Sequence, residues 1–411
     1  MFLSCRRVCL SLALLTTMFS LTSRAQQSAA LVGIAKYSRP DDPVHPDQAQ
    51  LGIQYSTVLI VRDGSEAAVK ITMPDIIVPH GKNWWRVGVT IGCHVHPQES
   101  SGDEEEQPSN HGHYEAWFEQ SYSSPLEKAP EVPSIYDQPG VPCPAQLIDD
   151  FRTGKDSRRP SNAPPPGDWE LPFQPCIYKS VAITAVTTSF VSTLYHGGNS
   201  ADCETRGFSW SDGGSVSSLE DLKPVSYGDL LKQKGLEEYK RVLIESGKEL
   251  ESDGMNCGLS EEAFDTSHRW AIDGTGWLLT REKGKWEAVA LLQPGNAACQ
   301  YGGSLSLPLT EELVGHDVLR PEWASLQRQI TGLQDAFTSP EGDLIVAVTK
   351  SQIEIYSLKG RRVGHRLLAL PADRVVMVQW ATGKYVGKWA EGLHVWQQKG
   401  LPPVVVRKPQ D

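Results

Sequence analysis

Short apolar runs separated by turn residues recur along most of this chain, which is typical of antiparallel β-structure. In the first third the runs cover 53–61, 67–73 and 84–93, and Asp63-Gly64 forms a turn signal between the first two. The third run, WWRVGVTIGC, alternates apolar and polar residues, as a strand with one buried face does. These runs predict an N-terminal β region over 47–122.

The stretch 181–231 predicts the heart of a central domain. A β-branched run is expected to turn at 197–199, which reads Gly-Gly-Asn, and to return as a second strand through Phe208 and Trp210. A second turn is expected at 212–214, which reads Asp-Gly-Gly. The pattern therefore predicts hairpins connected by glycine turns.

Helix signals follow these strands. Ser226 stands at an N-cap position, and apolar residues then recur at i, i+3 and i+7 on one helix face. Further strands are expected over 276–279, 286–292 and 303–307, with a short helix from Thr310. Strand pairs followed by helices predict the fold class α+β, with antiparallel β-hairpins and helices on one side in a central domain over 176–319.

Other segments divide the rest of the chain. Short strands at roughly ten-residue spacing predict a small C-terminal β module over 333–406. Polar or proline-rich composition predicts a flexible lead-in over 26–46, an acidic insertion over 94–110 and a proline-rich connector over 123–175.

The first 25 residues have the pattern of an export signal. Two arginines precede an apolar run of about 14 residues, which is shorter than the roughly 20 that span a bilayer. Ser23-Arg24-Ala25 fits a cleavage site. We therefore expect an exported chain, periplasmic or extracellular, with no membrane span after removal of the signal.

The net charge of the chain limits the classes of partner that it is expected to bind. The formal net charge is −11, and removal of the three arginines of the signal takes it to −14. A chain with this negative charge is repelled by nucleic acid and by anionic membranes. We therefore expect neither as a partner.

Six cysteines follow the signal, and an even number in an exported chain predicts up to three disulfides with 15 open connectivities. They are Cys93, Cys143, Cys176, Cys203, Cys257 and Cys299. None forms a CxxC pair, which argues against thiol–disulfide catalysis.

The central segment orders its signatures in a recognisable way. A Gly-Gly turn and a strand ending Phe-x-Trp-x-Asp-Gly-Gly are followed by SLEDL at 218–222, a helix, DGTGWLL at 273–279 and GGSLSLPLTEEL at 302–313. This order resembles the extracytoplasmic domain of lysozyme-sensing anti-sigma factors, which also occurs beside peptidoglycan deacetylase domains, and it covers about residues 181–319. The resemblance implies a non-catalytic α+β domain outside the cytoplasm, with a basic protein such as lysozyme as its partner.

Two sets of residues are candidates for a site. The metal candidates are His94 and His96 with His111 and His113, because four imidazoles can hold zinc or copper. The binding candidates are His196 and Asn199 at the expected turn, with Trp84, Trp85 and Trp210 as rings that can stack on sugars. No serine-hydrolase elbow is present, and the carboxylate pairs Glu220-Asp221 and Glu261-Glu262 are adjacent in sequence, which does not support glycosidase geometry.

The function expected from these patterns is non-catalytic binding of a protein or a cell-wall glycan at the cell envelope, without a cofactor. The alternative is a metal-dependent hydrolase that uses the histidine cluster.

Overall fold

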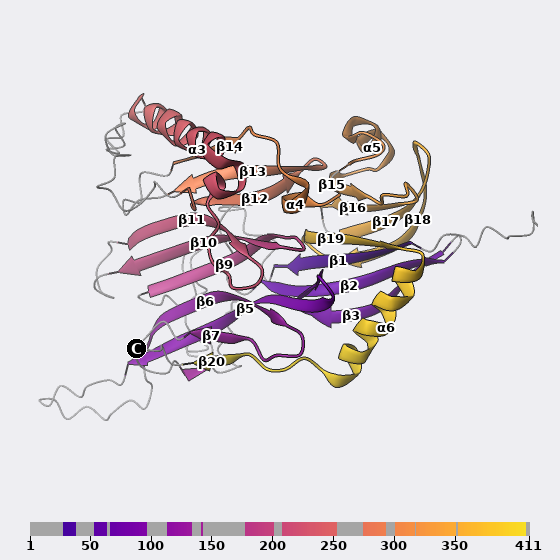
Figure 1. Ribbon diagram of the computed structural model, residues 1–411, viewed down its shortest axis with the longest axis horizontal. Coiled ribbons are helices and arrows are strands. Elements are labelled where there is room, and N and C mark those ends of the chain that lie inside the picture. Colours follow the sequence, from indigo (N-terminus) through magenta and orange to yellow (C-terminus); the bar gives the residue numbers. More distant parts are fainter. Residues whose placement is uncertain are drawn as a thin grey trace, which may run out of the picture.

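The computed structural model describes residues 28–37, 53–63, 66–96, 113–133, 141–142, 177–200, 208–252, 274–292, 301–316, 318–350 and 352–407. Within these ranges the protein consists mostly of antiparallel sheets with few helices, which is broadly the α+β class (Figure 1). None of the helices in these ranges is both long and apolar enough to cross a membrane.

The first third of the chain contributes strands alone: β1 (Ser28–Lys36), β2 (Gln54–Asp63), β3 (Glu66–Pro74), β4 (Ile76–His80), β5 (Asn83–His96), β6 (His113–Pro125), β7 (Glu131–Pro133) and β8 (Val141–Pro142). The centre contributes β9 (Ile177–Val186), β10 (Phe190–Ser200), β11 (Phe208–Ser218), α3 (Tyr227–Ser252), β12 (Trp277–Glu282), β13 (Lys285–Leu292), β14 (Tyr301–Leu305) and α4 (Glu311–Val314). The last part contributes α5 (Trp323–Gln329), β15 (Leu333–Thr338), β16 (Leu344–Thr349), β17 (Gln352–Lys359), β18 (Arg362–Pro371), β19 (Arg374–Thr382), α6 (Lys384–Lys399) and β20 (Val405–Arg407).

A four-stranded sheet in the order β19-β1-β2-β3 lies in the middle of the protein. Its strand β1 covers Ser28–Lys36, where the sequence predicted a flexible lead-in, so that prediction is wrong for these residues. The run SAALVGIA is buried on both faces and therefore lacks the alternation that marks a half-buried strand. The polar residues that follow this short apolar run favoured the prediction of a flexible segment over the whole of 26–46.

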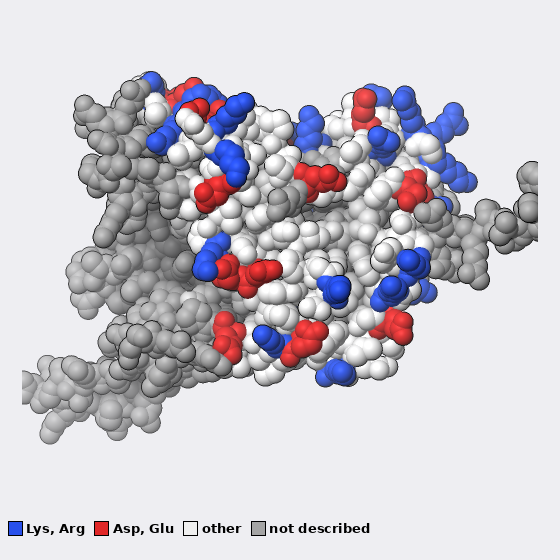
Figure 2. Space-filling view, in the orientation of Figure 1, with Lys and Arg blue, Asp and Glu red and all other residues white. Residues whose placement is uncertain are grey.

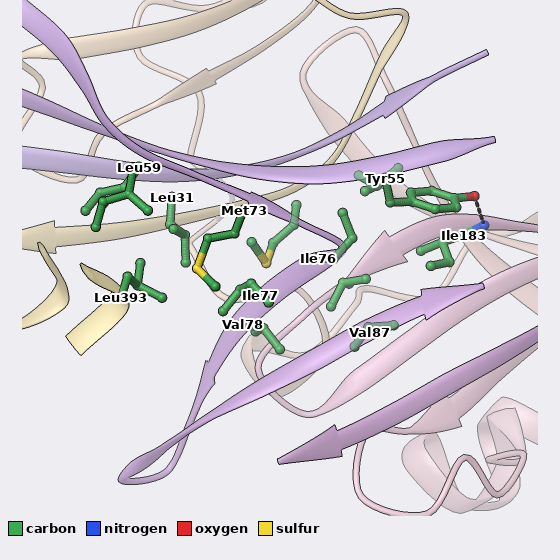
Figure 3. Close-up of a cluster of buried hydrophobic side chains, with 14 of the residues drawn as sticks. Leu31, Tyr55, Leu59, Met73, Ile76, Ile77, Val78, Val87, Ile183 and Leu393 are labelled. Atoms are coloured by element: carbon green, nitrogen blue, oxygen red, sulfur yellow. Dashed lines mark hydrogen bonds between the residues drawn. The ribbon is translucent and has the colours of Figure 1, made fainter. Parts of the chain in front are cut away.

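Both faces of this middle sheet are covered. One face packs on β4, β5, β9 and α6, and Figure 3 shows Leu31, Leu59 and Met73 facing Ile77 and Leu393. The other face packs on a second four-stranded sheet, β15-β16-β17-β18. The core therefore has two layers, one on each face of the middle sheet. Helix α6 covers the edge of the core beside β3 (Figure 1).

The largest sheet has ten strands and joins regions that are far apart in the sequence. Its main path runs β12-β13-β11-β10-β9-β6-β5-β4, and β6 pairs with β9 in parallel. The other two strands lie off this path: β14 pairs with β13 and β8 pairs with β5. Strand β19 near the C-terminus pairs with β1 near the N-terminus. The N-terminal β region, the central segment and the C-terminal strands thus share sheets.

Both glycine turns expected in the centre are wrong. Residues 197–199 lie inside β10 and residues 212–214 lie inside β11, while the β9–β10 turn lies at 187–189. The glycines serve packing: a Cβ on Gly213 would lie 2.0 Å from the hydroxyl of Tyr195, its partner on β10. A Cβ on Gly214 would lie 2.7 Å from Leu278.

Helix α3 covers the strands β12 to β14. It begins one residue after Ser226, whose hydroxyl accepts the N–H of Gly228 at 3.1 Å, as the predicted N-cap position requires. Its buried face places Tyr239 and Leu243 against Trp277 on β12. This packing holds α3 against the strands that it covers.

Candidate functional site

A cleft of about 620 Å³ opens between β13, the segment after β14, and α4. We name it the Trp286 cleft. Its apolar lining consists of Trp286, Ala288, Leu305, Leu307, Pro308, Leu309, Val314 and Val318, and its polar lining includes Glu287, Ser304, Ser306, Glu311 and His316. Apolar walls with a few polar groups are typical of small-molecule sites.

The cleft forms because β14 stops pairing with β13 partway along that strand. The last pair is Ala288 with Leu305, so Trp286 and Glu287 lie beyond the end of β14. The chain then leaves the sheet and enters α4, whose Leu313 is fully buried in the core beneath α3. Figure 1 shows α4 beside this group of strands. The wall formed by α4 is therefore anchored.

A carboxylate from α3 holds the segment that leaves the sheet. Oε1 of Glu238 accepts the N–H of Ser306 at 3.0 Å and its hydroxyl at 2.5 Å. Arg241 donates to the same carboxylate from Nε and from Nη2, each at 2.9 Å. These bonds from Arg241 and Ser306 lower the pKa of Glu238 to about 2. The carboxylate is therefore charged at neutral pH and fixes the cleft wall.

The indole of Trp286 is half-buried and is supported from behind. The guanidinium of Arg281 lies 5.3 Å from the indole centroid and 4.0 Å from the ring centroid of Phe337. Arg281 is itself buried, donates to the carbonyl of Ala336 at 2.8 Å and lies 3.3 Å from the carboxylate of Asp335. The indole is therefore held in one orientation in the cleft wall.

The carboxylate of Asp335 connects two hairpins behind this wall. It accepts the N–H of Gly284 at 2.7 Å, in the β12–β13 turn, and the N–H of Ala336 at 2.8 Å. Burial raises the pKa of Asp335, while Arg281 and the two N–H groups act in the opposite direction. This contact joins β12–β13 to β15.

The histidine candidates lie on neighbouring strands. His94 and His96 belong to β5 and His113 to β6, and the register pairs His96 directly with His113. His111 lies outside the described residues, as do the side chains of the other three. The metal site therefore stays a prediction.

The aromatic candidates lie apart from the Trp286 cleft. Trp84 contacts Trp389 of α6 with ring centroids 5.8 Å apart, and Trp85 contacts His80 at 5.3 Å. Both are half-buried against the middle core, where they pack between elements. Whether they also bind a ligand stays a prediction.

The remaining candidates belong to the β10–β11 pair. The register places His196 opposite Asp212, Gly198 opposite Trp210 and Asn199 opposite Ser209. The side chains of these candidates are outside the described part of the chain. Of the six cysteines, the structure describes the backbone of Cys93 in β5 alone, so the disulfide prediction is untested.

Sequence reasoning missed the Trp286 cleft. The sequence predicts a strand at Trp286 and a helix at Glu311, but no spacing connects these residues with Ser304 or His316. The cleft depends on where β14 stops pairing with β13. Only the three-dimensional register shows that relationship.

Comparison of the chain with family models, with curated proteins and with solved structures finds no match.

Proposed function

We propose that this chain is an exported, non-catalytic binding protein of the cell envelope, and that its Trp286 cleft holds a short cell-wall glycan. The observation that carries the proposal is the half-buried indole in the wall of a cleft of 620 Å³. Ligand sites commonly have volumes of about 300–1,000 Å³. Export rests on the pattern of the first 25 residues.

The lining suits a sugar. One face of a pyranose ring carries C–H groups that pack on an indole, and the ring edge carries hydroxyls that need hydrogen-bond partners. Ser304 offers a hydroxyl, Ser306 offers an acceptor oxygen because its proton is donated to Glu238, and Glu287 and Glu311 offer carboxylate acceptors. The support from Arg281 orients the indole before a ligand arrives, which reduces the entropic cost of binding.

Binding is favoured over bond cleavage. Glu287 and Glu311 are both exposed to solvent, whereas a carboxylic acid that donates a proton near neutral pH is enclosed in apolar surroundings. The proposal therefore assigns the carboxylates to recognition of sugar hydroxyls.

Calorimetric titration with soluble muropeptides tests this function. We expect saturable binding by the full chain, and affinity lower by about fivefold or more in Trp286→Phe and in Glu287→Gln/Ser304→Ala. Glu249→Gln on α3 is the matched control, because it removes one exposed carboxylate away from the cleft. Equal affinity in all variants, or no binding by the unmodified chain, would contradict the proposal.

A titration with lysozyme distinguishes the partner that the family resemblance implies. Lysozyme binding that is saturable, in the absence of muropeptide binding, would favour a protein ligand over a glycan.

A second candidate, metal-dependent hydrolysis, rests on the register that pairs His96 with His113. Directly opposed residues have Cβ atoms about 5 Å apart, a spacing that two ligands of one ion can use. A stoichiometric zinc or copper ion that is lost in His94→Ala/His96→Ala would support it, and metal-free protein after incubation with either ion would exclude it.

A further inference from the structure

The β17–β18 hairpin and α5 bring four exposed cations together. They are Arg328 on α5, Lys359 at the end of β17, Arg361 in the turn that follows, and Arg362 at the start of β18. We call them the cationic hairpin patch. Figure 2 shows basic side chains gathered at the upper right, over α5 and the adjacent strand ends. The protein as a whole is acidic, with a net charge of −11.

The fold holds these charges next to one another. The side chain of Gln329 on α5 accepts the N–H of Val363 at 2.9 Å and donates to the carbonyl of Arg361 at 3.5 Å. Leu326 on α5 packs with Leu358 on β17 in a separate small core. The helix and the hairpin therefore present their cations as one surface.

The hairpin places two positive charges directly opposite each other. Lys359 and Arg362 are direct cross-strand partners, and like charges in that position destabilise a hairpin. Across the described ranges no carboxylate forms an ion pair with any of the four cations. The neighbouring Arg366, in contrast, contacts Glu354 at 2.7 Å. A bound anion would offset the repulsion within the patch.

The shape of the patch indicates an extended ligand. A Cβ on Gly360, at the tip of the hairpin, would have no atom within 4 Å, so the tip projects into open space. A projecting surface cannot enclose a small ion, but it can contact successive charges of a polymer. Arginine forks bind carboxylate, sulfate and phosphate groups through paired hydrogen bonds.

The neighbouring side chains favour a polysaccharide over a membrane or a nucleic acid. Large exposed apolar residues in the described ranges are Val318, Tyr385, Val395 and Val405, and none belongs to the patch. The patch therefore has no exposed apolar group to insert into a bilayer and no exposed ring on which a base stacks. We propose that the cationic hairpin patch binds an acidic polysaccharide.

The experiment measures binding of the full chain to immobilised heparin and to polygalacturonate at several salt concentrations. We expect binding that weakens as salt rises, because solvent-exposed charge pairs are screened. Arg361→Gln/Arg362→Gln should weaken it by about tenfold, since arginine–anion contacts are charge-assisted. Lys234→Gln/Lys248→Gln on α3 is the control, because it removes the same number of exposed charges elsewhere, and it should change affinity by less than about twofold.

Two further arms complete the test. Arg361→Lys/Arg362→Lys keeps the charge and loses the fork, so its affinity should lie between those of the unmodified chain and the glutamine variant. Muropeptide affinity should be the same in all these variants, because the patch lies outside the Trp286 cleft. Equal losses in the α3 control, no polysaccharide binding, or tighter binding to anionic phosphatidylglycerol vesicles or to single-stranded DNA would overturn the proposal.

Discussion

Glu238 on α3 accepts hydrogen bonds from both the backbone N–H and the hydroxyl of Ser306, the first residue after β14. Ser306 also lines the Trp286 cleft. Through this carboxylate α3 holds the segment that forms a cleft wall, although no described residue of α3 lines the cleft itself.

Replacing Glu238 by glutamine should loosen this wall. The amide oxygen can still accept both bonds from Ser306, but the charged contact with the half-exposed Arg241 is lost, which we expect to lower the unfolding free energy by up to about 1 kcal/mol. Muropeptide affinity should fall with it. Denaturant unfolding and calorimetry measure both effects, and Glu249→Gln serves as the matched control. An unchanged affinity would show that the wall does not depend on this anchor.

The same contact predicts a pH dependence. The pKa of Glu238 is about 2 in the folded protein against 4.5 as its ordinary value, so the folded state binds this proton less strongly than the unfolded state does. The stability it contributes is present above pH 4.5 and is lost as the pH falls toward 2. The difference in melting temperature between the unmodified chain and Glu238→Gln should therefore shrink between pH 5 and pH 2.5. A constant difference over that interval would count against the assignment.

Two buried tyrosines should respond in opposite ways to the loss of their hydroxyls. The hydroxyl of Tyr55 accepts the N–H of Ile183 at 2.8 Å and links the middle sheet to β9 (Figure 3). Tyr55→Phe leaves that buried N–H without this partner, which should cost about 1–3 kcal/mol. The hydroxyl of Tyr227 is buried and has no hydrogen-bond partner among the described residues. Tyr227→Phe should be neutral or stabilising by up to about 1 kcal/mol.

Denaturant unfolding of both phenylalanine variants checks this pair of predictions. Tyr385→Phe, on the exposed face of α6, is the control and should change stability by less than about 0.5 kcal/mol. Equal effects at Tyr55 and Tyr227 would show that the two hydroxyls have similar surroundings.

Two glycine-to-alanine changes should also differ in sign. At Gly213 the new methyl group would displace the ring of Tyr195, which lies over the glycine on the neighbouring strand, at a cost of about 1–2 kcal/mol. At Gly387, inside α6, nothing lies within 4 Å of the new Cβ, so better helix propensity should add about 0.5–1 kcal/mol. Thermal unfolding measures both. A Gly213→Ala protein as stable as the unmodified chain would contradict the close approach of Tyr195 to this glycine.

Sequence patterns located many strands but few of their partners. Alternation identified β5, and the spacing of apolar residues identified α3, because both signals are local. Strand β1 was missed because burial on both faces removes alternation. The glycines of β10 and β11 were assigned to turns because close cross-strand packing requires the same residue type.

The candidate site could not be predicted from the sequence for a related reason. Trp286 and Glu311 come together through the end of the β13–β14 pairing, and Ser306 depends on an anchor 68 residues away in the sequence. Long-range register of this kind leaves no spacing in the sequence. The histidine and tryptophan candidates, in contrast, were chosen from local motifs, and Trp84 and Trp85 lie in a different part of the fold from the cleft.

The most direct measurement of the central claim uses the twelve tryptophans of the chain as reporters. Each contributes one indole N–H signal to a nitrogen-15 correlation spectrum of tryptophan-labelled protein, and the signal missing from Trp286→Phe identifies Trp286. On titration with muropeptides, we predict a saturable shift of the Trp286 signal while the signals of Trp84 and Trp389 stay in place. A Trp286 signal that does not move while others shift would contradict the claim that this cleft holds the ligand.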